Sequence, residues 1–254
     1  MSDAGLLDRI VSVKKEEIRA LKTGSAPIVE SRFLEAIRRP PGKQIRIIAE
    51  CKRTSPSSGR MREVYDPESI AQTYAELGAA ALSVLTDKEF FEGKPEDLVQ
   101  AKRSGLPALR KDFVIHEKQI ADAARLGADA VLLIVRILDI SQLAEYIEFA
   151  RSLGLPALVE THNEREIETA LRVKSEIIGI NHRDLDTLKM DLSLTPRLAP
   201  QIRKENPNIV LVAESGVENA AGIATVDAFA DAALIGTAFM KSRDLAATWK
   251  SILG

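Results

Sequence analysis

Eight short apolar runs, separated by longer stretches with helical spacing, constrain the fold of this chain more than any other feature. The runs begin near Ile45, Ala80, Pro107, Ala130, Pro156, Ile177, Ile209 and Ala232. Amphipathic stretches between them include 67–77, 118–126, 141–153 and 163–173, and helix ends are predicted at Gly78, Gly105, Gly127 and Gly154. Eight alternating strands and helices predict a parallel sheet closed into a (β/α)8 TIM barrel, of the α/β class. An open doubly wound sheet is the alternative, but no Gly-x-Gly-x-x-Gly turn follows the first strand.

The length of the chain agrees with one such barrel. Barrels of this class take about 250 residues, and this chain has 254. Hydrophobic residues make up 45% of it and charged residues 28%, so a large core can form and disorder is not expected. We therefore predict a single barrel domain over residues 1–254, of which residues 1–44 form an N-terminal helical extension.

Two segments with helical spacing precede the first strand. Residues 3–22 carry apolar side chains about one turn apart, and residues 30–37 form a second, short helix that ends before Pro40-Pro41-Gly42. Because they have too few apolar side chains for a core of their own, we expect both to pack on the barrel rather than form a separate interaction hairpin. Two placements are open: over the catalytic mouth, or as a plug at the amino-terminal end of the strands.

Charge and cysteine content exclude several classes of protein. A formal net charge of -2 and a pI near 6.0 give no electrostatic footprint for nucleic acid. The one cysteine, Cys51, cannot form an internal disulfide, and the N-terminus lacks the profile of a signal peptide. Arg136 interrupts the longest candidate for a membrane helix. We expect a soluble, cytoplasmic enzyme that binds neither nucleic acid nor membrane, as a monomer or alternatively a homodimer.

The first predicted strand ends in charge. The segment 47–59, IIAECKRTSPSSG, runs from β-branched residues into a loop rich in Ser, Pro and Gly. Side chains alternate along a strand, so Glu50 and Lys52 point to one face and Cys51 to the other. Opposite charges at the end of a buried strand must pair or take part in chemistry, because burial costs desolvation energy. They are either a structural ion pair or one wall of an active site.

A repeated pentapeptide relates the third and fifth strands. Gly-Leu-Pro-Ala-Leu occurs at 105–109 and again at 154–158, and the same alignment carried two residues further sets Lys111 against Glu160. Alternate strands of a barrel contribute to one interior layer. We therefore expect Lys111 and Glu160 to face the interior at a similar height, near the charges of the first strand.

The last strands end in glycine-containing turns. Residues 212–216 end the seventh strand with Gly216, and residues 234–238 end the eighth with Gly236. Loops at these two strands often bind phosphate in barrels, where glycine lets backbone N–H groups approach the anion. Either glycine alone is equally explained by a tight turn. Together they predict a phosphate site.

The three histidines do not have the spacing of a metal site. His162 and His182 follow strand ends and His116 begins a helix, without a His-x-His or His-Glu-x-x-His motif. A Ser-His-Asp triad is not expected either, because no Gly-x-Ser-x-Gly turn exists. We predict no metal.

Six motifs together resemble those of the indole-3-glycerol phosphate synthase family of tryptophan biosynthesis. They are AECKRTSPSSG (49–59), SVLTDKEFFEG (83–93), LRKDF (109–113), LVETH (158–162), GINHRDL (179–185) and AESG (213–216). The departures from the family pattern are Cys51, where an apolar residue is usual, His182, where Asn is common, and Thr237-Ala238 in a phosphate loop. The resemblance implies extra N-terminal helices that cover the catalytic mouth.

The resemblance also implies a reaction without a cofactor. The substrate would be 1-(2-carboxyphenylamino)-1-deoxyribulose 5-phosphate, which a carboxy-lyase closes to indole-3-glycerol phosphate with loss of carbon dioxide and water. Lys111 would be the general acid that protonates the ketone oxygen and Glu160 the general base. Lys52 would anchor the carboxylate or act as a second acid, and Glu50 would keep the lysines charged. Further contacts implied are Asn181 and Ser215 to substrate hydroxyls, Ser55 to the carboxylate, Phe90 and Phe113 to the aromatic ring, Arg183 and Glu214 to the substrate, and Gly216, Gly236 and Thr237 to the phosphate.

Two other functions stay open at this point. A Schiff-base aldolase also places a lysine on an inner barrel strand, and Lys111 or Lys52 would serve. A sugar-phosphate binder without activity would need the phosphate contacts but not a placed acid and base. The full set of Glu50, Lys52, Lys111, Glu160 and Asn181 argues against the binder.

Overall fold

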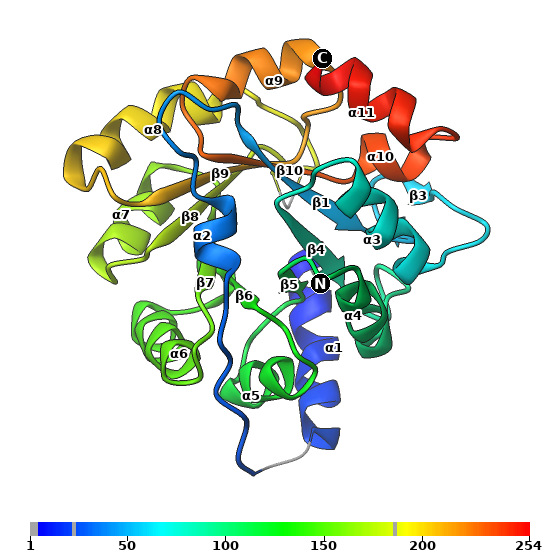
Figure 1. The fold of residues 1–254 in the computed structure, drawn as a ribbon. Coiled ribbons are helices and arrows are strands. Elements are labelled where there is room, and N and C mark those ends of the chain that lie inside the picture. The colour runs from blue at the N-terminus through cyan, green and yellow to red at the C-terminus, as the bar shows by residue number, and fades with distance from the viewer. Residues whose placement is uncertain (1–4, 22–23, 185–186) are drawn as a thin grey trace.

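Eight parallel strands close into a barrel in the computed structural model, which describes residues 5–21, 24–184 and 187–254 (Figure 1). The strands are β1 (Arg46–Cys51), β4 (Ala81–Leu85), β5 (Ala108–Lys111), β6 (Ala130–Ile134), β7 (Ala157–Thr161), β8 (Ile177–Asn181), β9 (Val210–Glu214) and β10 (Ala232–Ile235). Each pairs with its neighbours in chain order, and β1 closes the barrel by pairing with both β4 and β10. The predicted (β/α)8 fold is confirmed.

Helices surround the barrel, and several of them begin at a residue whose side chain caps the helix. They are α3 (Pro67–Glu76), α4 (Pro95–Ala101), α5 (Glu117–Arg125), α6 (Ile140–Ser152), α7 (Glu164–Arg172), α8 (Leu194–Glu205), α9 (Ala220–Asp227), α10 (Thr237–Lys241) and α11 (Leu245–Leu253), with short 3-10 turns at Lys102–Ser104 and Val135–Ile137. Asp66 and Asp139 accept backbone N–H groups at the starts of α3 and α6. A small hairpin, β2 (Thr54–Ser55) and β3 (Gly59–Arg60), follows β1 and was not predicted. No described helix is long and apolar enough to cross a membrane.

The alternation of side chains along β1 separates two layers of core. Ile48 belongs to the cluster inside the barrel, whereas Ile47, Ala49 and Cys51 belong to the cluster between strands and outer helices. Glu50 points inward with Ile48 and lines the cavity at the mouth. The predicted opposition of Glu50 and Cys51 is confirmed, and the Cys51 thiol is buried and free.

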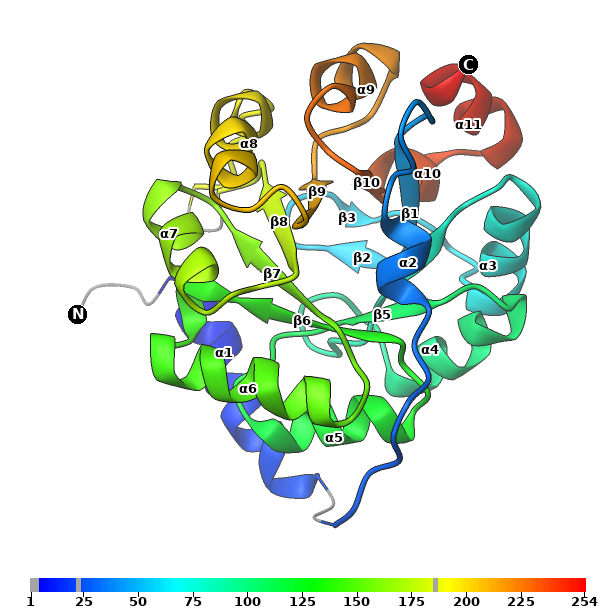
Figure 2. The same cartoon turned by 60° about the vertical axis from the view of Figure 1, so that its left-hand side comes forward.

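The two N-terminal helices lie at opposite ends of the barrel. Helix α1 (Leu6–Ala20) lies on the side toward which the arrows of β6 and β7 point, and α2 (Phe33–Ile37) lies on the other side (Figure 2). Both are shorter than predicted, and the predicted helix residues 3–4 and 22 lie outside the described residues. Helix α1 therefore takes the placement at the mouth, and α2 takes the placement as a plug at the amino-terminal end of the strands.

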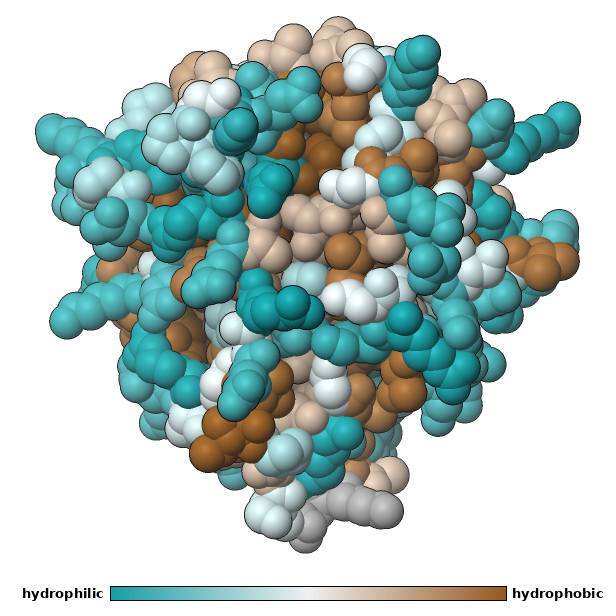
Figure 3. All heavy atoms as spheres, in the orientation of Figure 1, coloured by the Kyte–Doolittle hydropathy of each residue, from teal (hydrophilic) through white to brown (hydrophobic). Residues whose placement is uncertain are grey.

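Helix α2 closes the amino-terminal end of the strands, called the base below. Phe33 and Ile37 are fully buried in the interior cluster, which contains Ala81 at the start of β4. Arg46 donates a hydrogen bond from Nε to the Ala36 carbonyl at 3.2 Å, which ties α2 to the start of β1. Around this plug, the base presents a mostly hydrophilic surface with apolar side chains between (Figure 3).

Candidate functional site

One cavity at the carboxyl ends of the strands gathers almost all of the predicted site residues. Its lining includes Glu50, Lys52, Ser55, Lys111, Phe113, Glu160, Asn181, Arg183, Glu214, Ser215, Gly216, Gly236 and Thr237. Helix α1 supplies Leu6, Leu7 and Ile10 to the same lining, so α1 forms part of the mouth. Of the predicted residues, Phe90 is not part of it.

The aromatic wall is formed by Phe91 and Phe113, not by Phe90 and Phe113. The rings of Phe91 and Phe113 lie 6.1 Å apart between centroids, and both line the cavity. Asp87 holds the turn, because its Oδ1 accepts the backbone N–H groups of Phe90 and Phe91 at 2.7 and 3.1 Å. This turn decides which ring faces inward, and the alternation of a strand does not extend into it.

Lys111 sits between two buried carboxylates. Its Nζ lies 3.0 Å from Glu160 Oε2 and 3.3 Å from Glu214 Oε2, and both carboxylates are almost fully buried. The ion pair with Glu160 joins the third and fifth strands of the barrel, β5 and β7, at the height that the repeated pentapeptide predicts. Lys111 therefore brings a positive charge into reach of two groups that can take or give a proton.

The two carboxyl groups have opposite pKa shifts. Burial raises the pKa of Glu214 to about 8, with Glu160 nearby adding to the effect against the attraction of Lys111. Burial would also raise the pKa of Glu160, but Lys111 and His162 together lower it below its usual value. The surroundings therefore favour the ionised form of Glu160, and Glu214 is the carboxyl group of the two that takes up a proton more readily. The pKa of Lys111 would be lowered by its burial, but Glu160 and Glu214 raise it, so Lys111 is charged.

A glycine makes room for the charge pair at the end of β1. Lys52 Nζ lies 2.5 Å from Glu50 Oε1, and Ser83 Oγ donates to Glu50 Oε2 at 3.5 Å. A Cβ on Gly236 would lie only 2.2 Å from Glu50 Oε1. Gly236 is thus required by the position of Glu50, a reason that the sequence did not reveal.

The same constraint recurs beneath Glu214. A Cβ on Gly179 would lie 1.9 Å from Glu214 Oε1. Both glycines therefore leave space for a buried carboxylate that faces the cavity.

Asn181, Arg183 and Ser215 lie at the rim above β8 and β9. Asn181 Oδ1 accepts the Arg183 backbone N–H at 3.0 Å, which fixes the amide against the loop. Ser215 and Gly216 both have left-handed backbone, with φ of 66° and 78°. A Cβ on Gly216 would lie 2.3 Å from Met190 Cε, the far end of a flexible and exposed side chain, so it is mainly the positive φ that favours glycine there. Leu185, in the predicted motif 179–185, lies outside the described residues.

The comparisons with known proteins agree on one family. The sequence profile described as indole-3-glycerol phosphate synthase matches residues 7–252. A curated protein of that name from Leptospira interrogans is 42% identical over 248 residues, covering 97% of this chain and 96% of the relative. Another from Deinococcus radiodurans is 42% identical over 255 residues, covering 98% and 95%. The chain belongs to the indole-3-glycerol phosphate synthase family. By its family it is a carboxy-lyase.

A solved structure of lower similarity shows the fold alone. The N-acetylmannosamine-6-phosphate 2-epimerase from Clostridium perfringens superposes with a TM-score of 0.62 at 14% identity, covering 85% of this chain and 93% of that one.

Two histidines lie beside the site of this member of the indole-3-glycerol phosphate synthase family. One contacts its carboxylates and the other contacts a loop. His162 Nε2 lies 3.4 Å from Glu160 Oε1, close but poorly aligned for a hydrogen bond, and its Nδ1 lies 3.0 Å from Glu166 Oε2. Burial would lower the pKa of His162, but these two carboxylates raise it to about 9. His162 is therefore charged at neutral pH and helps to keep Glu160 ionised. The i, i+4 spacing of His162 and Glu166 at the start of α7 is a signal that sequence reasoning missed.

His182 is a neutral, structural residue. Burial lowers its pKa, and its Nδ1 lies 2.8 Å from the Ser215 carbonyl, which can only accept, so Nδ1 carries the proton. Its Nε2 then accepts from the Thr195 hydroxyl at 2.8 Å. This departure from the family pattern thus holds the Ser215 turn in place. Among the described residues, no three His, Cys, Asp or Glu side chains are grouped as a metal site would require.

Proposed function

We propose that this protein is an indole-3-glycerol phosphate synthase that closes 1-(2-carboxyphenylamino)-1-deoxyribulose 5-phosphate to indole-3-glycerol phosphate, with loss of one carbon dioxide and one water. Family membership supports the reaction. The observation that carries the assignment of roles is the buried Lys111 between Glu160 and Glu214, because it provides one proton donor and two carboxyl groups whose pKa values are shifted in opposite directions.

Ring closure uses Lys111. The ring carbon that bears the carboxylate attacks the ketone carbon, and the ketone oxygen takes a proton from the Lys111 ammonium. Loss of carbon dioxide then restores the aromatic ring. The charge on Lys111 favours this step, since it stabilises the negative charge that develops on the ketone oxygen.

Dehydration uses the carboxyl groups. Glu160, which is ionised in the resting site, takes a proton from the cyclised intermediate. An acid then assists the departure of hydroxide. Lys52 is the first candidate for that acid, and Glu214, whose pKa is raised to about 8 by its burial, is the second. Glu50 orients Lys52 through their ion pair.

The remaining lining residues bind the two ends of the substrate. Phe91 and Phe113 flank the aromatic ring, and Ser55 with Lys52 takes its carboxylate. Asn181, Arg183 and Ser215 contact the hydroxyls, and the phosphate is held by Gly216, Gly236 and Thr237 through their backbone N–H groups. The departure at Thr237 leaves these contacts to the backbone rather than to its hydroxyl.

A Schiff-base aldolase is disfavoured by the carboxylates that surround the two lysines. Such an enzyme needs a neutral amine to attack a carbonyl. Glu160 and Glu214 raise the pKa of Lys111 against the effect of its burial, and Lys52 is paired with Glu50. Lys111 is therefore not in the form that an aldolase requires, and Lys52 is held in an ion pair.

The test is to add the carboxyphenylamino substrate to the protein without added metal or cofactor. Indole fluorescence should rise with one carbon dioxide released per indole formed. In a parallel sample, borohydride with a ketose phosphate should trap no covalent adduct. An adduct on Lys111 or Lys52, or no indole at all, would overturn the proposal.

A further inference from the structure

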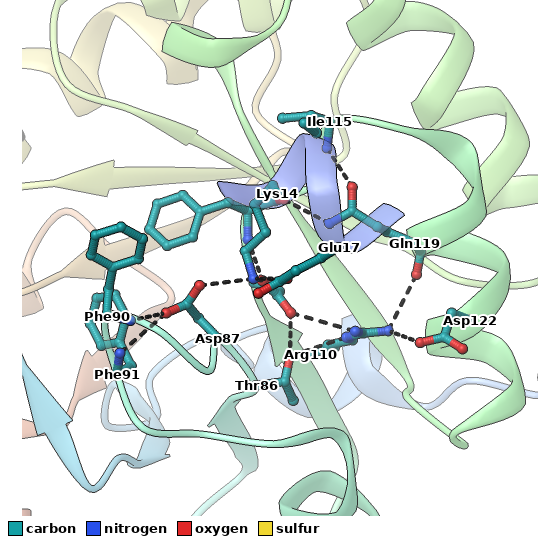
Figure 4. A network of polar contacts seen from close by, with 12 residues as sticks. Lys14, Glu17, Thr86, Asp87, Phe90, Phe91, Arg110, Ile115, Gln119 and Asp122 are labelled. Atoms are coloured by element: carbon teal, nitrogen blue, oxygen red, sulfur yellow. Dashed lines mark hydrogen bonds and ion pairs between the residues drawn. The ribbon is translucent and has the colours of Figure 1, made fainter. Parts of the chain in front are cut away.

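Lys14 in α1 is a charged side chain at a buried position, where an apolar side chain would be expected. It is 1% exposed, although it belongs to a helix that otherwise meets the barrel with Leu6, Leu7 and Ile10. Its Nζ lies 2.8 Å from each of three carboxylates, those of Glu17, Asp87 and Asp112 (Figure 4). Asp87 and Asp112 are themselves buried.

These contacts determine the protonation of Lys14. Burial would lower the pKa of Lys14, but Asp112 and Asp87 raise it, so the ammonium is charged. Its contact with Asp87 is close but poorly aligned for a hydrogen bond, and is an ion pair. A buried ion pair contributes little to stability compared with apolar packing, but it fixes one arrangement of its partners.

Both buried partners hold residues of the aromatic wall. Asp87 caps the turn of Phe90 and Phe91 through Oδ1, and contacts Lys14 through Oδ2. Asp112 lies between Lys111 and Phe113, and its Oδ1 accepts the Phe113 backbone N–H at 2.9 Å. Lys14 therefore lies at the junction of the two loops that carry the rings at the mouth.

The outer side of Asp112 is anchored on the barrel. Its Oδ2 accepts from Thr86 Oγ1 at 2.6 Å and contacts Arg110 Nη2 at 3.4 Å, and Arg110 Nη1 lies 2.8 Å from Asp122 Oδ2 (Figure 4). Asp112 is thus held in place from outside as well as by Lys14. Asp87 is different: apart from its turn, its carboxylate is held by Lys14.

We propose that Lys14 is a positioning residue for the substrate's aromatic ring: its ammonium joins Asp87 to Asp112 and so sets the distance between Phe91 and Phe113 while seating α1 over the mouth. The inference rests on the proposed function, since it assigns this wall to the ring of the substrate. Lys14 does not itself line the cavity, and acts only through the two aspartates.

The first test compares two substitutions around one ammonium. Lys14→Met removes the charge, and Glu17→Gln removes the third, partly exposed partner, which holds neither aromatic loop. Lys14→Met should raise KM by about tenfold or more, the effect of losing a stacked aromatic contact with its burial, while kcat changes less than about threefold. Glu17→Gln should leave both constants near wild type. A Lys14→Met protein that melts earlier with an unchanged KM would overturn the proposal.

A second variant covers the case in which Lys14→Met does not fold because two aspartates lose their partner. Asp87→Asn keeps the oxygen that accepts the Phe90 and Phe91 N–H groups and removes the charge that pairs with Lys14. It should raise KM in the same way, and the double variant Lys14→Met with Asp87→Asn should be no worse than either single one. Independent, multiplicative effects on KM would contradict the shared role.

A measurement without substrate separates this inference from the proposed function. Amide hydrogen exchange at Phe90 and Phe91 should become faster in Lys14→Met, or in Asp87→Asn if the first does not fold, and stay unchanged in Glu17→Gln. Unchanged exchange in the charge-deleting variant would refute the role of Lys14, whether or not the wild type forms indole. Absence of indole with faster exchange would refute only the proposed function.

Discussion

The two ends of the barrel are closed by two helices of the same extension in different ways. At the base, α2 inserts Phe33 and Ile37, fully buried, into the apolar interior. At the mouth, α1 brings partly exposed Leu6 and Leu7 together with the buried charge of Lys14. Apolar burial stabilises a fold without directing polar groups, whereas buried charges are costly and directional. The base therefore contributes mainly to stability, whereas the buried charges of the mouth give up some stability in order to hold side chains in position.

Removing the central charge of the mouth is the strongest test of this difference between the two ends of the barrel. Lys111→Ala should lower kcat by about 10²-fold or more, because an acid that acts in the transition state is lost. KM should change less. An unaltered kcat would show that the charges of the mouth are structural, like the plug at the base.

The opposite test truncates the plug. Phe33→Ala should lower the free energy of unfolding by about 3–5 kcal/mol, the usual range for a buried Phe, with KM and kcat at 25 °C close to wild type. Urea unfolding and steady-state kinetics on the same preparation would show this, with the exposed Glu35→Ala on the same helix as control. A large loss of kcat would mean that the base also positions the site.

The pH dependence of stability should come from the mouth. The folded-state pKa of His162 is raised to about 9 from its usual 6.5, and that of Glu214 to about 8. A group with a raised folded-state pKa stabilises the fold below its unfolded pKa, and this stabilisation is lost as pH rises through the folded pKa. Stability should therefore fall between about pH 4.5 and 8 through Glu214 and between about pH 6.5 and 9 through His162. The His162 part is on the order of 3 kcal/mol. His162→Gln should flatten the slope of the thermal midpoint against pH, and Phe33→Ala should leave it unchanged.

The smallest effect expected is at the apolar edge of α1. Leu7→Ala removes part of the cavity lining and should raise KM about fivefold, from roughly 1 kcal/mol of lost apolar contact. Its thermal midpoint should move less than that of Phe33→Ala. The exposed Arg9→Ala on the same helix serves as control, and equal KM values for the two would remove α1 from the binding site.

The sequence predicted the residues whose positions follow from strand periodicity. Glu50 faces the mouth and Cys51 the outer helices because side chains alternate, and Lys111 meets Glu160 because two strands share one repeat. Phe90 was implied by the family resemblance and not by periodicity, and a turn capped by Asp87 places Phe91 rather than Phe90 in the cavity lining.

Contacts between distant segments could not be predicted at all. Lys14 and Asp112 are almost a hundred positions apart in the sequence, yet Lys14 Nζ lies 2.8 Å from Asp112 Oδ1 in the fold. Composition likewise did not reveal that α1 and α2 separate to opposite ends. The single domain and the monomeric state stay predictions.

The proposed division of roles between Lys111 and Glu160 is tested most directly by a single-turnover experiment with Glu160→Gln, which keeps the shape of the site and removes the base. Carbon dioxide and indole are followed together after mixing enzyme in excess with substrate. Carbon dioxide should be released while indole fluorescence lags or fails to appear, because ring closure by Lys111 is expected to precede dehydration by Glu160. Indole formed in step with carbon dioxide at the wild-type rate would contradict this division of roles.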